Sequence, residues 1–459
     1  MSVSTKPASG FRDFLPADVR RREYVFSVIR EVYESYGFEP LDTPCFERLT
    51  TLLGKYGEEG DQLIFKILQR GRKLEKALGT DDPSETDLAD MGMRYDLTVP
   101  LARVYAEYRN DLPAIFKRYQ IAPVWRADRP QRGRFREFYQ CDVDVVGSES
   151  LIVEAEVTAA LAEVLRRLEF KGTRIHLNNR QLLRAVILRA KIPIEKEGDA
   201  LVAIDKLDKV GLEGVQKELL ERDISQESVD ILLPLLGITT KGEPGSFTNE
   251  ATLDALEEAV GDIEEGAQAI ADMRKLLRLA QDGPAADLLF IDPYLARGLS
   301  YYTGSIFEIR SDDFSGSLGG GGRYDGLIGM FSKKSEPACG FSLGVERILV
   351  LMEERGMFDA TRPDVDVLVT MWDDDFAPNS LRLANELRSQ GLRVDIYARQ
   401  KDKYKKQFKY ADERRIPVVA ILAPNELEKG VVALKNMKSG DQEDVPREQV
   451  AERVKAMLS

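Results

Sequence analysis

The pattern of apolar residues predicts a helix followed by a strand near the start of the chain. Over residues 16–36 apolar side chains recur every three or four positions, and the pattern stops before Gly37. The following segment, 38–46, has the composition of a strand and ends at Pro44. The N-terminal region therefore contributes one amphipathic helix and one extended segment.

A charged hairpin is predicted further along. A helix is expected over 95–108, where Pro100 falls in its first turn. Segments 116–125 and 138–146 have strand patterns, and the loop between them, 126–133, is rich in Pro, Gly and Arg. These two segments should form an antiparallel pair that presents positive charge at its tip.

The middle of the chain predicts a helical block that interrupts a sheet. A helix over 148–168 precedes a strand around His176, and residues 178–287 show charged helical patterns with short breaks. Strand character returns at 288–292, 306–310 and 338–341, and a helix follows over 344–355.

Beyond Pro363 the pattern of apolar and polar residues changes. Short apolar strands alternate with helices, which is typical of a small α/β domain with a mainly parallel sheet. No internal repeat is present.

Composition and charge narrow the class of protein. The chain has 459 residues, 43% of them hydrophobic and 31% charged, so it can bury one or more cores and should form two to four domains. No apolar run approaches the roughly 18 residues of a membrane helix, and residues 1–12 lack the apolar core of a signal peptide, so we expect a cytoplasmic protein with no membrane partner. The formal charge of -13 argues against wholesale wrapping by nucleic acid, but it permits a local basic surface.

Cysteine and histidine usage excludes several chemistries. Cys45, Cys141 and Cys339 are far apart and form no CxxC pair, so we expect reduced core thiols rather than disulfides or a cysteine zinc site. The single histidine, His176, rules out a multi-histidine metal site, and its strand-like surroundings favour a structural role. Chemistry must then depend on carboxylates, arginines, lysines and backbone dipoles.

Arginines gather in two places that could bind an anion. The predicted hairpin carries five of them, at Arg126, Arg129, Arg132, Arg134 and Arg136. A solvated loop is the ordinary alternative, but flanking strands would hold the planar guanidinium groups in a geometry suited to phosphate or carboxylate. A further arginine, Arg347, follows a strand and a turn in CGFSLGVERI, and alone it would be interpreted as a helix-surface residue. A glycine run occupies 319–322, and alone it predicts a loop.

Together these segments resemble motifs 2 and 3 of class II aminoacyl-tRNA synthetases, and YGFEPLDTPCFE resembles motif 1 with its terminal proline. LARGLSYYTGSIFEI at 295–309 and GGGGRYDGL at 319–327 resemble the peptides peculiar to histidyl-tRNA synthetases, and GFRDFLP and RYDLTVP fit the same family. The resemblance implies ATP-dependent activation of L-histidine to histidyl-adenylate and transfer to tRNA(His), with release of AMP and diphosphate.

The same resemblance implies an ATP site. It assigns the α-phosphate to Arg126, the terminal phosphates to Arg134 and Arg347, and adenine stacking to Phe138. Arg297 would bridge the substrate carboxylate and the α-phosphate, so Arg126 and Arg297 are the expected catalytic residues. The attacking carboxylate is already ionised, so alignment and charge neutralisation matter more than a general base. Mg²⁺ should accompany ATP, with ligands that the sequence does not identify, and no zinc, haem or organic prosthetic group is expected.

Histidine recognition is implied by a second set of residues. A neutral imidazole offers one donor and one acceptor. By resemblance Asp144 accepts from the ring and Tyr301 and Tyr302 lie against it, while Asp96, Thr98 and Gln140 hold the α-amino group. The family's bacterial branch usually has Glu at positions 96 and 144, so the chemistry is kept with a shorter reach. Two further departures from the family pattern are Asp128 in motif 2 and Ser300 in the RGLSYY peptide.

A basic stretch near the C-terminus suggests RNA contact. From 388 to 415 the chain has ten Lys or Arg against four Asp or Glu, roughly +6, interleaved with aromatic residues at Tyr397, Tyr404, Phe408 and Tyr410. Phosphate contact with base stacking would suit single-stranded RNA, and a solvated amphipathic helix is the alternative. The resemblance makes this an anticodon-binding domain. The expected tRNA contacts are Arg129, Gln131, Arg132, Lys405, Lys406 and Lys409.

We therefore expect an α/β fold with a six- or seven-stranded antiparallel catalytic sheet flanked by helices. The expected domains are a catalytic domain (1–180 and 287–357), a helical insertion that lies against the acceptor stem (181–286) and a mixed α/β anticodon-binding domain (364–459). Motif 1 implies a homodimer.

Three other classes compete with this interpretation. A synthetase-like regulatory subunit would lack the C-terminal domain and the arginines, and an RNA sensor of the stress-kinase type would carry kinase motifs. A synthetase for another amino acid would share motifs 1 to 3 but not the two histidine peptides.

Overall fold

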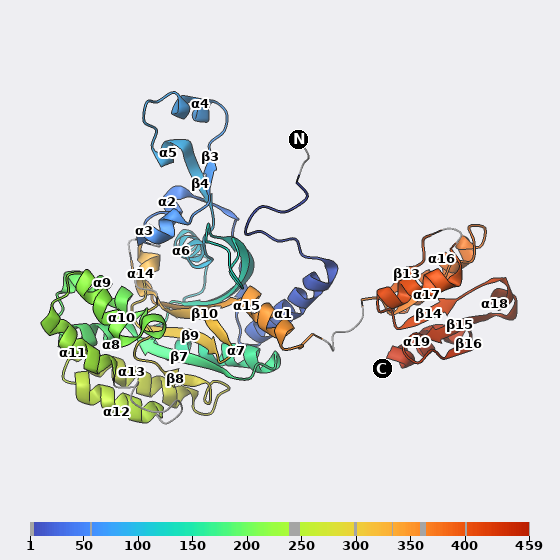
Figure 1. Cartoon of the computed structure of the whole chain (residues 1–459). Helices are drawn as coiled ribbons and strands as arrows, with labels where there is room; N and C mark the ends of the chain where they lie inside the picture. Colours follow the sequence, from blue (N-terminus) through green and yellow to red (C-terminus); the bar gives the residue numbers. More distant parts are fainter. Residues whose placement is uncertain are drawn as a thin grey trace. The chain divides into compact units, whose positions relative to one another are not determined.

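The computed structural model describes residues 4–55, 57–237, 248–297, 301–332, 334–358, 364–399 and 402–458. The chain separates into two compact units, Met1–Gly356 and Met357–Ser459, and each is described by itself (Figure 1).

An eight-stranded sheet forms the centre of the first unit, in the order β1-β5-β6-β11-β10-β9-β7-β8. Its strands are β1 (Glu39–Pro40), β5 (Phe116–Trp125), β6 (Glu137–Val146), β11 (Ala338–Gly344), β10 (Phe314–Arg323), β9 (Ser305–Ser311), β7 (Thr173–Asn179) and β8 (Leu289–Ile291). The six strands from β5 to β7 in this order pair antiparallel, as expected. Two short edge strands pair in parallel, β1 with β5 and β8 with β7, and raise the total above the predicted six or seven.

Helices cover the sheet and bury their apolar stripes against it. The predicted N-terminal helix is confirmed as α1 (Pro16–Ser35), with Val25, Ile29 and Val32 fully buried on one side. It packs against α7 (Ile152–Arg167) and α15 (Val345–Glu354), and α15 contacts β6 and β10. On other strands of the sheet, α6 (Thr98–Glu107) and α14 (Asp325–Gly329) share an apolar cluster with Phe116 and Val146.

Between β1 and α6 in the sequence, the chain forms a small three-stranded sheet. It consists of β2 (Phe46–Arg48), β4 (Ala89–Met93) and β3 (Lys66–Leu68), with α2 (Leu49–Leu52), α3 (Gly57–Gln62), α4 (Arg72–Leu78) and α5 (Glu85–Leu88). The strand predicted over 38–46 is therefore wrong in extent. Only Glu39–Pro40 forms a strand of the large sheet, and Phe46 already begins β2 of the small one; Pro44, which has no backbone N–H, lies between them.

The helical block between β7 and β8 is confirmed. It contains α8 (Arg180–Arg189), η1 (Ile194–Lys196), α9 (Glu197–Ile204), α10 (Leu207–Glu221), α11 (Gln226–Leu236), α12 (Asn249–Val260) and α13 (Glu264–Ala280). Helix α13 packs on α8 and α7, which ties the block to the helices that cover the sheet (Figure 1).

The second unit is a five-stranded sheet covered by helices on both faces. Its strands, in spatial order, are β13 (Val394–Ile396), β12 (Val367–Val369), β14 (Val418–Ile421), β15 (Val431–Asn436) and β16 (Gln442–Pro446). The helices are α16 (Ala377–Ser389), α17 (Tyr404–Glu413), α18 (Pro424–Lys429), η2 (Arg447–Gln449) and α19 (Val450–Leu458). The first three strands are parallel and the last two antiparallel, so the sheet is mixed rather than mainly parallel. The β15–β16 hairpin, which the apolar pattern did not reveal, accounts for the difference.

The glycine run at 319–322 lies in the C-terminal half of β10, although alone it predicts a loop. A Cβ on Gly321 would lie 2.2 Å from the carbonyl oxygen of Gly340, and one on Gly322 would lie 2.4 Å from the carbonyl oxygen of Ser305. The neighbouring strands approach β10 too closely for any side chain at these two positions, so glycine is required by packing and not by a turn.

The cysteines and the histidine follow the expectations with one exception. Cys141 and Cys339 are buried, whereas Cys45 is exposed and is not a core thiol. His176 lies in β7 with its Nδ1 2.8 Å from Oδ2 of Asp292 and its ring edge-on to Phe290. Burial raises the pKa of Asp292, but its contacts with His176, Arg310 and the backbone N–H of Tyr294 together outweigh burial, and the net shift is downward. These contacts fit a structural role. Within the described residues, no helix is both long and apolar enough to span a membrane.

Candidate active site

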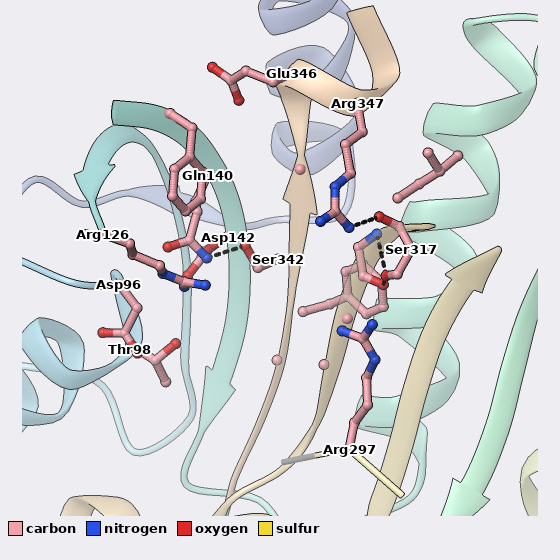
Figure 2. A pocket seen from close by; sticks show the side chains of 18 of the residues that line it. Asp96, Thr98, Arg126, Gln140, Asp142, Arg297, Ser317, Ser342, Glu346 and Arg347 are labelled. Carbon is pink, nitrogen blue, oxygen red and sulfur yellow. Dashed lines mark hydrogen bonds between the residues drawn. The ribbon is translucent and has the colours of Figure 1, made fainter. Parts of the chain in front are cut away.

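A cavity of about 420 Å³ opens over the middle of the large sheet. Its walls come from strands β6, β10 and β11, the β5–β6 loop, the segment before α6 and the start of α15 (Figure 2). All the residues predicted to bind ATP or histidine line it: Asp96, Thr98, Arg126, Arg134, Phe138, Gln140, Asp144, Arg297, Tyr301, Tyr302 and Arg347. The fold therefore brings together segments that are more than 200 residues apart in the sequence.

Four arginines, Arg126, Arg134, Arg297 and Arg347, surround this cavity. Burial lowers the pKa of Arg347, and the nearby charges of Arg297, Arg134 and Arg126 lower it further. Arg347 donates from Nη1 to the carbonyl oxygen of Ser317, which fixes its direction. Guanidinium groups that destabilise one another's charge create a strongly positive potential, and a polyphosphate would relieve it.

Neighbouring groups orient these arginines. Arg126 donates from Nε to the carbonyl oxygen of Tyr95 at 3.1 Å, and its guanidinium lies 4.2 Å from the Tyr95 ring centre and 5.1 Å from that of Phe138. Arg134 pairs with Asp128 at 2.7 Å. Asp128, one of the departures from the family pattern, is thus buried beside an arginine of the cavity. The other departure, Ser300, lies outside the described residues.

Strand β6 supplies a row of polar groups on one face. Gln140, Asp142 and Asp144 alternate with buried Cys141 and Val143, so all three polar side chains point to the cavity. Across the sheet, Asp142 pairs with Gln120 of β5 and Ser342 of β11, and Asp144 pairs with Arg118 and Gly340. A Cβ on Gly340 would lie 1.9 Å from Oδ1 of Asp144, so this carboxylate needs glycine beside it.

A buried charge cluster lies beneath this row. Arg118 is fully buried, and its Nη2 lies 2.8 Å from Oδ2 of Asp144 and 4.0 Å from Oδ2 of Asp142. Tyr324 donates its hydroxyl to Oδ1 of Asp144. Burial raises the pKa of both carboxyls, that of Asp142 to about 7, while Arg118 lowers both. The imidazole contact expected of Asp144 would therefore use a carboxylate held by a cation and a phenol.

Sequence reasoning missed three members of this cluster: Arg118, Asp142 and Tyr324. The alternation in QCDVDV could have identified Asp142, because a strand face that contains Gln140 and Asp144 also contains residue 142, midway between them. Arg118 is revealed only by the pairing register of β5 and β6.

Glu346 is a further residue of the lining that the sequence did not indicate. Burial raises its pKa to about 7, while it accepts a hydrogen bond from the backbone N–H of Tyr139 at 3.1 Å. Arg12 lies 3.8 Å from it and also stacks on the Phe135 ring at 3.4 Å. The GFRDFLP segment is thereby connected to the edge of the cavity.

The expected tRNA contacts lie elsewhere. Arg129, Gln131 and Arg132 are exposed on the β5–β6 loop and do not line the cavity, and Arg132 pairs with Glu354. The lysines expected to contact tRNA are exposed on α17 of the second unit: Lys405, Lys406 and Lys409.

The aromatic residues of the same basic stretch pack against the core of the second unit. Tyr397 is buried, and three partly buried rings pack against the same apolar cluster as Tyr397: Tyr404, Phe408 and Tyr410. These rings lie on the core-facing side of an amphipathic helix and its neighbouring strand, which fits the amphipathic-helix alternative.

Comparison with known proteins follows the same division of the chain. A family model described as histidyl-tRNA synthetase matches residues 10–348, and one described as an anticodon binding domain matches residues 364–457. The chain is 43% identical over 447 residues to a histidine–tRNA ligase of Porphyromonas gingivalis, covering 95% of this chain and 96% of that protein. It is 40% identical over 460 residues to one of Bacteroides fragilis, covering 98% and 99%.

Comparison with solved structures supports the same family. The crystal structure of histidyl-tRNA synthetase from Nostoc sp. PCC 7120 matches with a TM-score of 0.82 and 29% identity, covering 100% of both chains. The cavity, the two histidine peptides that contribute to it and these full-length relatives lead to one conclusion: the chain belongs to the histidyl-tRNA synthetase family.

Proposed function

We propose that the chain activates L-histidine with ATP in this cavity and transfers the histidyl group to tRNA(His), releasing AMP and diphosphate. The observation that carries the proposal is one cavity with four arginines and, on β6, the polar row of Gln140, Asp142 and Asp144. An anionic nucleotide and a zwitterionic amino acid together match this division of charge.

The first step is in-line attack by a carboxylate oxygen of histidine on the α-phosphorus of ATP, with diphosphate as the leaving group. Arg126 would hold the α-phosphate, and Arg297 would bridge it to the histidine carboxylate. Arg134 and Arg347 would bind the terminal phosphates, and Phe138 would stack on adenine. The nucleophile is already an anion, so the residues act by alignment and by stabilising negative charge in the transition state.

The histidine side chain would be recognised by Asp144 and by a pair of tyrosines. The Tyr301 and Tyr302 rings have centres 4.5 Å apart and hydroxyls 3.4 Å apart, and burial raises the pKa of Tyr301 to about 12. Both therefore remain neutral, and their hydroxyls can donate at pH 7. A site with fixed donors and acceptors discriminates strongly against side chains that lack the matching groups.

Mg²⁺ is proposed to enter with ATP. Among the residues that the structure describes, no group of three or more His, Cys, Asp or Glu is placed to hold a metal ion. This fits Mg²⁺, which such sites usually bind through one or two carboxylates together with substrate phosphates, and Asp128 and Glu346 are carboxylates of the lining. When bound, the ion would neutralise phosphate charge.

Assembly and tRNA binding extend the proposal. In the cytoplasm, tRNA(His) would be contacted by all three domains: the catalytic domain (1–180 and 287–357), the insertion domain (181–286) and the anticodon-binding domain (364–459). A homodimer is supported by apolar side chains that remain exposed in the small sheet, which begins within motif 1, with Phe46 53% and Met91 38% exposed.

The test is ATP–diphosphate exchange with each of the twenty amino acids, on the wild type, Arg297→Ala and Arg310→Ala. Both arginines pair with Glu308, but only Arg297 lines the cavity, so Arg310→Ala is a matched control. We expect exchange with histidine alone, lowered about 100- to 1000-fold by Arg297→Ala and much less by Arg310→Ala. A folded wild type that binds histidine and exchanges with no amino acid would make the regulatory-subunit interpretation the better one.

A further inference from the structure

We propose that Asp142 is a substrate-binding residue, whose carboxylate receives the α-ammonium group of histidine together with the amide oxygen of Gln140. The inference rests on the proposed function and adds to it a residue that the family resemblance did not assign.

Three buried acceptors of the cavity have no hydrogen-bond partner among the described residues. One of them, Oδ2 of Asp144, lies 2.8 Å from Nη2 of Arg118, and the other two are Oδ1 of Asp142 and Oε1 of Gln140. Asp142 is 1% exposed and Gln140 is 8% exposed, and both line the cavity from adjacent same-face positions of β6. Gln140 donates from Nε2 to Oγ of Ser342 at 2.6 Å, which leaves its oxygen as the group in need of a donor. Figure 2 shows Gln140 and Asp142 near Asp96 and Thr98, across the cavity from Arg297.

The ligand group that satisfies two neighbouring acceptors must bring at least two donors. A neutral imidazole has only one N–H, while the carboxylate and phosphates of the substrates are acceptors. An ammonium group carries three N–H donors and a positive charge. Of the groups that histidine and ATP present at pH 7, the α-ammonium is the cationic one.

Charge balance favours the same occupant. Arg118 is the one cation within 4.0 Å of both buried carboxylates in the described structure, and it is nearer to Asp144 than to Asp142. With both carboxylates ionised, the cluster has an uncompensated negative charge, which is costly in a buried site. An incoming ammonium would neutralise it.

The ionisation of Asp142 then becomes linked to histidine binding. Burial raises its pKa to about 7, Arg118 lowers it, and Asp144 and Asp96 raise it. The charged or titratable groups that face it are Arg118, Asp144, Asp96, Tyr33, Cys141 and Tyr301. Because a cation takes the place of the proton, binding of histidine near pH 7 should release roughly half a proton from this carboxyl.

The experiment compares histidine with 3-(imidazol-4-yl)propionate, which lacks the ammonium group, by titration calorimetry on three proteins. In Asp142→Asn we expect histidine affinity to fall roughly 10- to 100-fold. The affinity of the analogue should change less than about threefold, because it has no ammonium group to lose a hydrogen bond with Asp142. Asp144→Asn, the control, should weaken both ligands because it removes the imidazole contact.

Proton release provides a second readout that needs no variant. Histidine titrations at pH 7 in two buffers of different ionisation enthalpy should give different apparent heats with the wild type and a smaller difference with Asp142→Asn. Equal loss of both ligands in Asp142→Asn would overturn the inference. A wild type that fails to bind histidine at all would instead refute the proposed function.

Discussion

Replacing Arg118 by methionine tests whether the buried cluster under the cavity is held together by charge. Methionine keeps much of the length of the side chain but leaves Asp144 and Asp142 without their cation. Tyr324 and the surrounding strands would remain, so the change isolates the electrostatic contribution.

The expected loss is large because every charge is buried. Arg118 is 0%, Asp142 1% and Asp144 2% exposed, and the closest N–O distance is 2.8 Å. Removing one partner of such a pair typically costs about 3 to 5 kcal/mol. Arg118 lowers the pKa of both carboxyls, so both pKa values should rise in the variant. The stability difference between wild type and Arg118→Met should be smallest in acid, where both carboxyls are protonated in both proteins. This difference should grow as the pH rises through about 7.

The chain offers a clean probe for this unit. It has two tryptophans, Trp125 in the first unit and Trp372 in the second, and Trp125 is buried at 7% exposure. In a Trp372→Phe background, the fluorescence of Trp125 reports urea unfolding of the first unit alone. With a slope of about 3 kcal/mol per M, Arg118→Met should lower the midpoint by about 1 to 2 M at pH 8.

A double variant controls for the loss of packing. Arg118→Met with Asp144→Asn also removes the nearer carboxylate, so it should recover part of the stability of the wild type at pH 8. The reasoning is refuted if Arg118→Met shifts the midpoint equally at pH 5 and pH 8, or if the double variant is the less stable of the two, because packing rather than charge would then explain the loss.

Two further perturbations test the floor of the cavity. Gly321→Ala should lower the free energy of unfolding by about 1 to 3 kcal/mol, because its Cβ would lie 2.2 Å from the Gly340 carbonyl oxygen. In the control variant, Gly320→Ala, the Cβ would lie 3.6 Å from its nearest neighbours, so the loss of stability should be smaller. Equal melting temperatures of the two variants would contradict the packing argument. Asp142→Asn should be more stable than the unliganded wild type at pH 8 by roughly 1 to 4 kcal/mol. The raised pKa of Asp142, about 7, makes the wild type lose stability as the pH rises from about 4 to about 7, so thermal unfolding that shows no pH-dependent difference between the two proteins would count against it.

The sequence predicted those parts of the fold in which local pattern and tertiary pairing agree. Strand β5 has the predicted ends, Phe116–Trp125, and β6 begins one residue early, at Glu137. Strand β6 alternates cavity-facing polar residues with buried apolar ones, and the loop rich in Pro, Gly and Arg marks where the two strands end, so period and loop composition carry the information. The candidate ATP and histidine residues came from the family resemblance, and the fold gathers all of them in one cavity.

The rest depended on contacts between distant segments. The glycine run at 319–322 is a strand because it pairs with β9 on one side and β11 on the other, and no local pattern encodes that pairing. The aromatic residues of the basic stretch, such as Phe408, serve the core of the second unit since the strands beneath α17 need an apolar cover. Arg118 is assigned to the buried cluster only by the strand register, which places it opposite Asp144.

The register of β5, β6 and β11 explains why one cavity can orient two substrates of different charge. Pairing places Arg118 beside Asp144 and Ser342 beside Asp142, so the acidic and amide groups are fixed along one face of β6. The arginines come from segments outside that face: the β5–β6 loop, the segment at Arg297 and helix α15. A zwitterion placed between these two sets can satisfy both charges only with its ammonium toward β6 and its carboxylate toward the arginines. That orientation is the one in which the carboxylate faces the bound α-phosphate, so the sheet register itself would set the direction of attack.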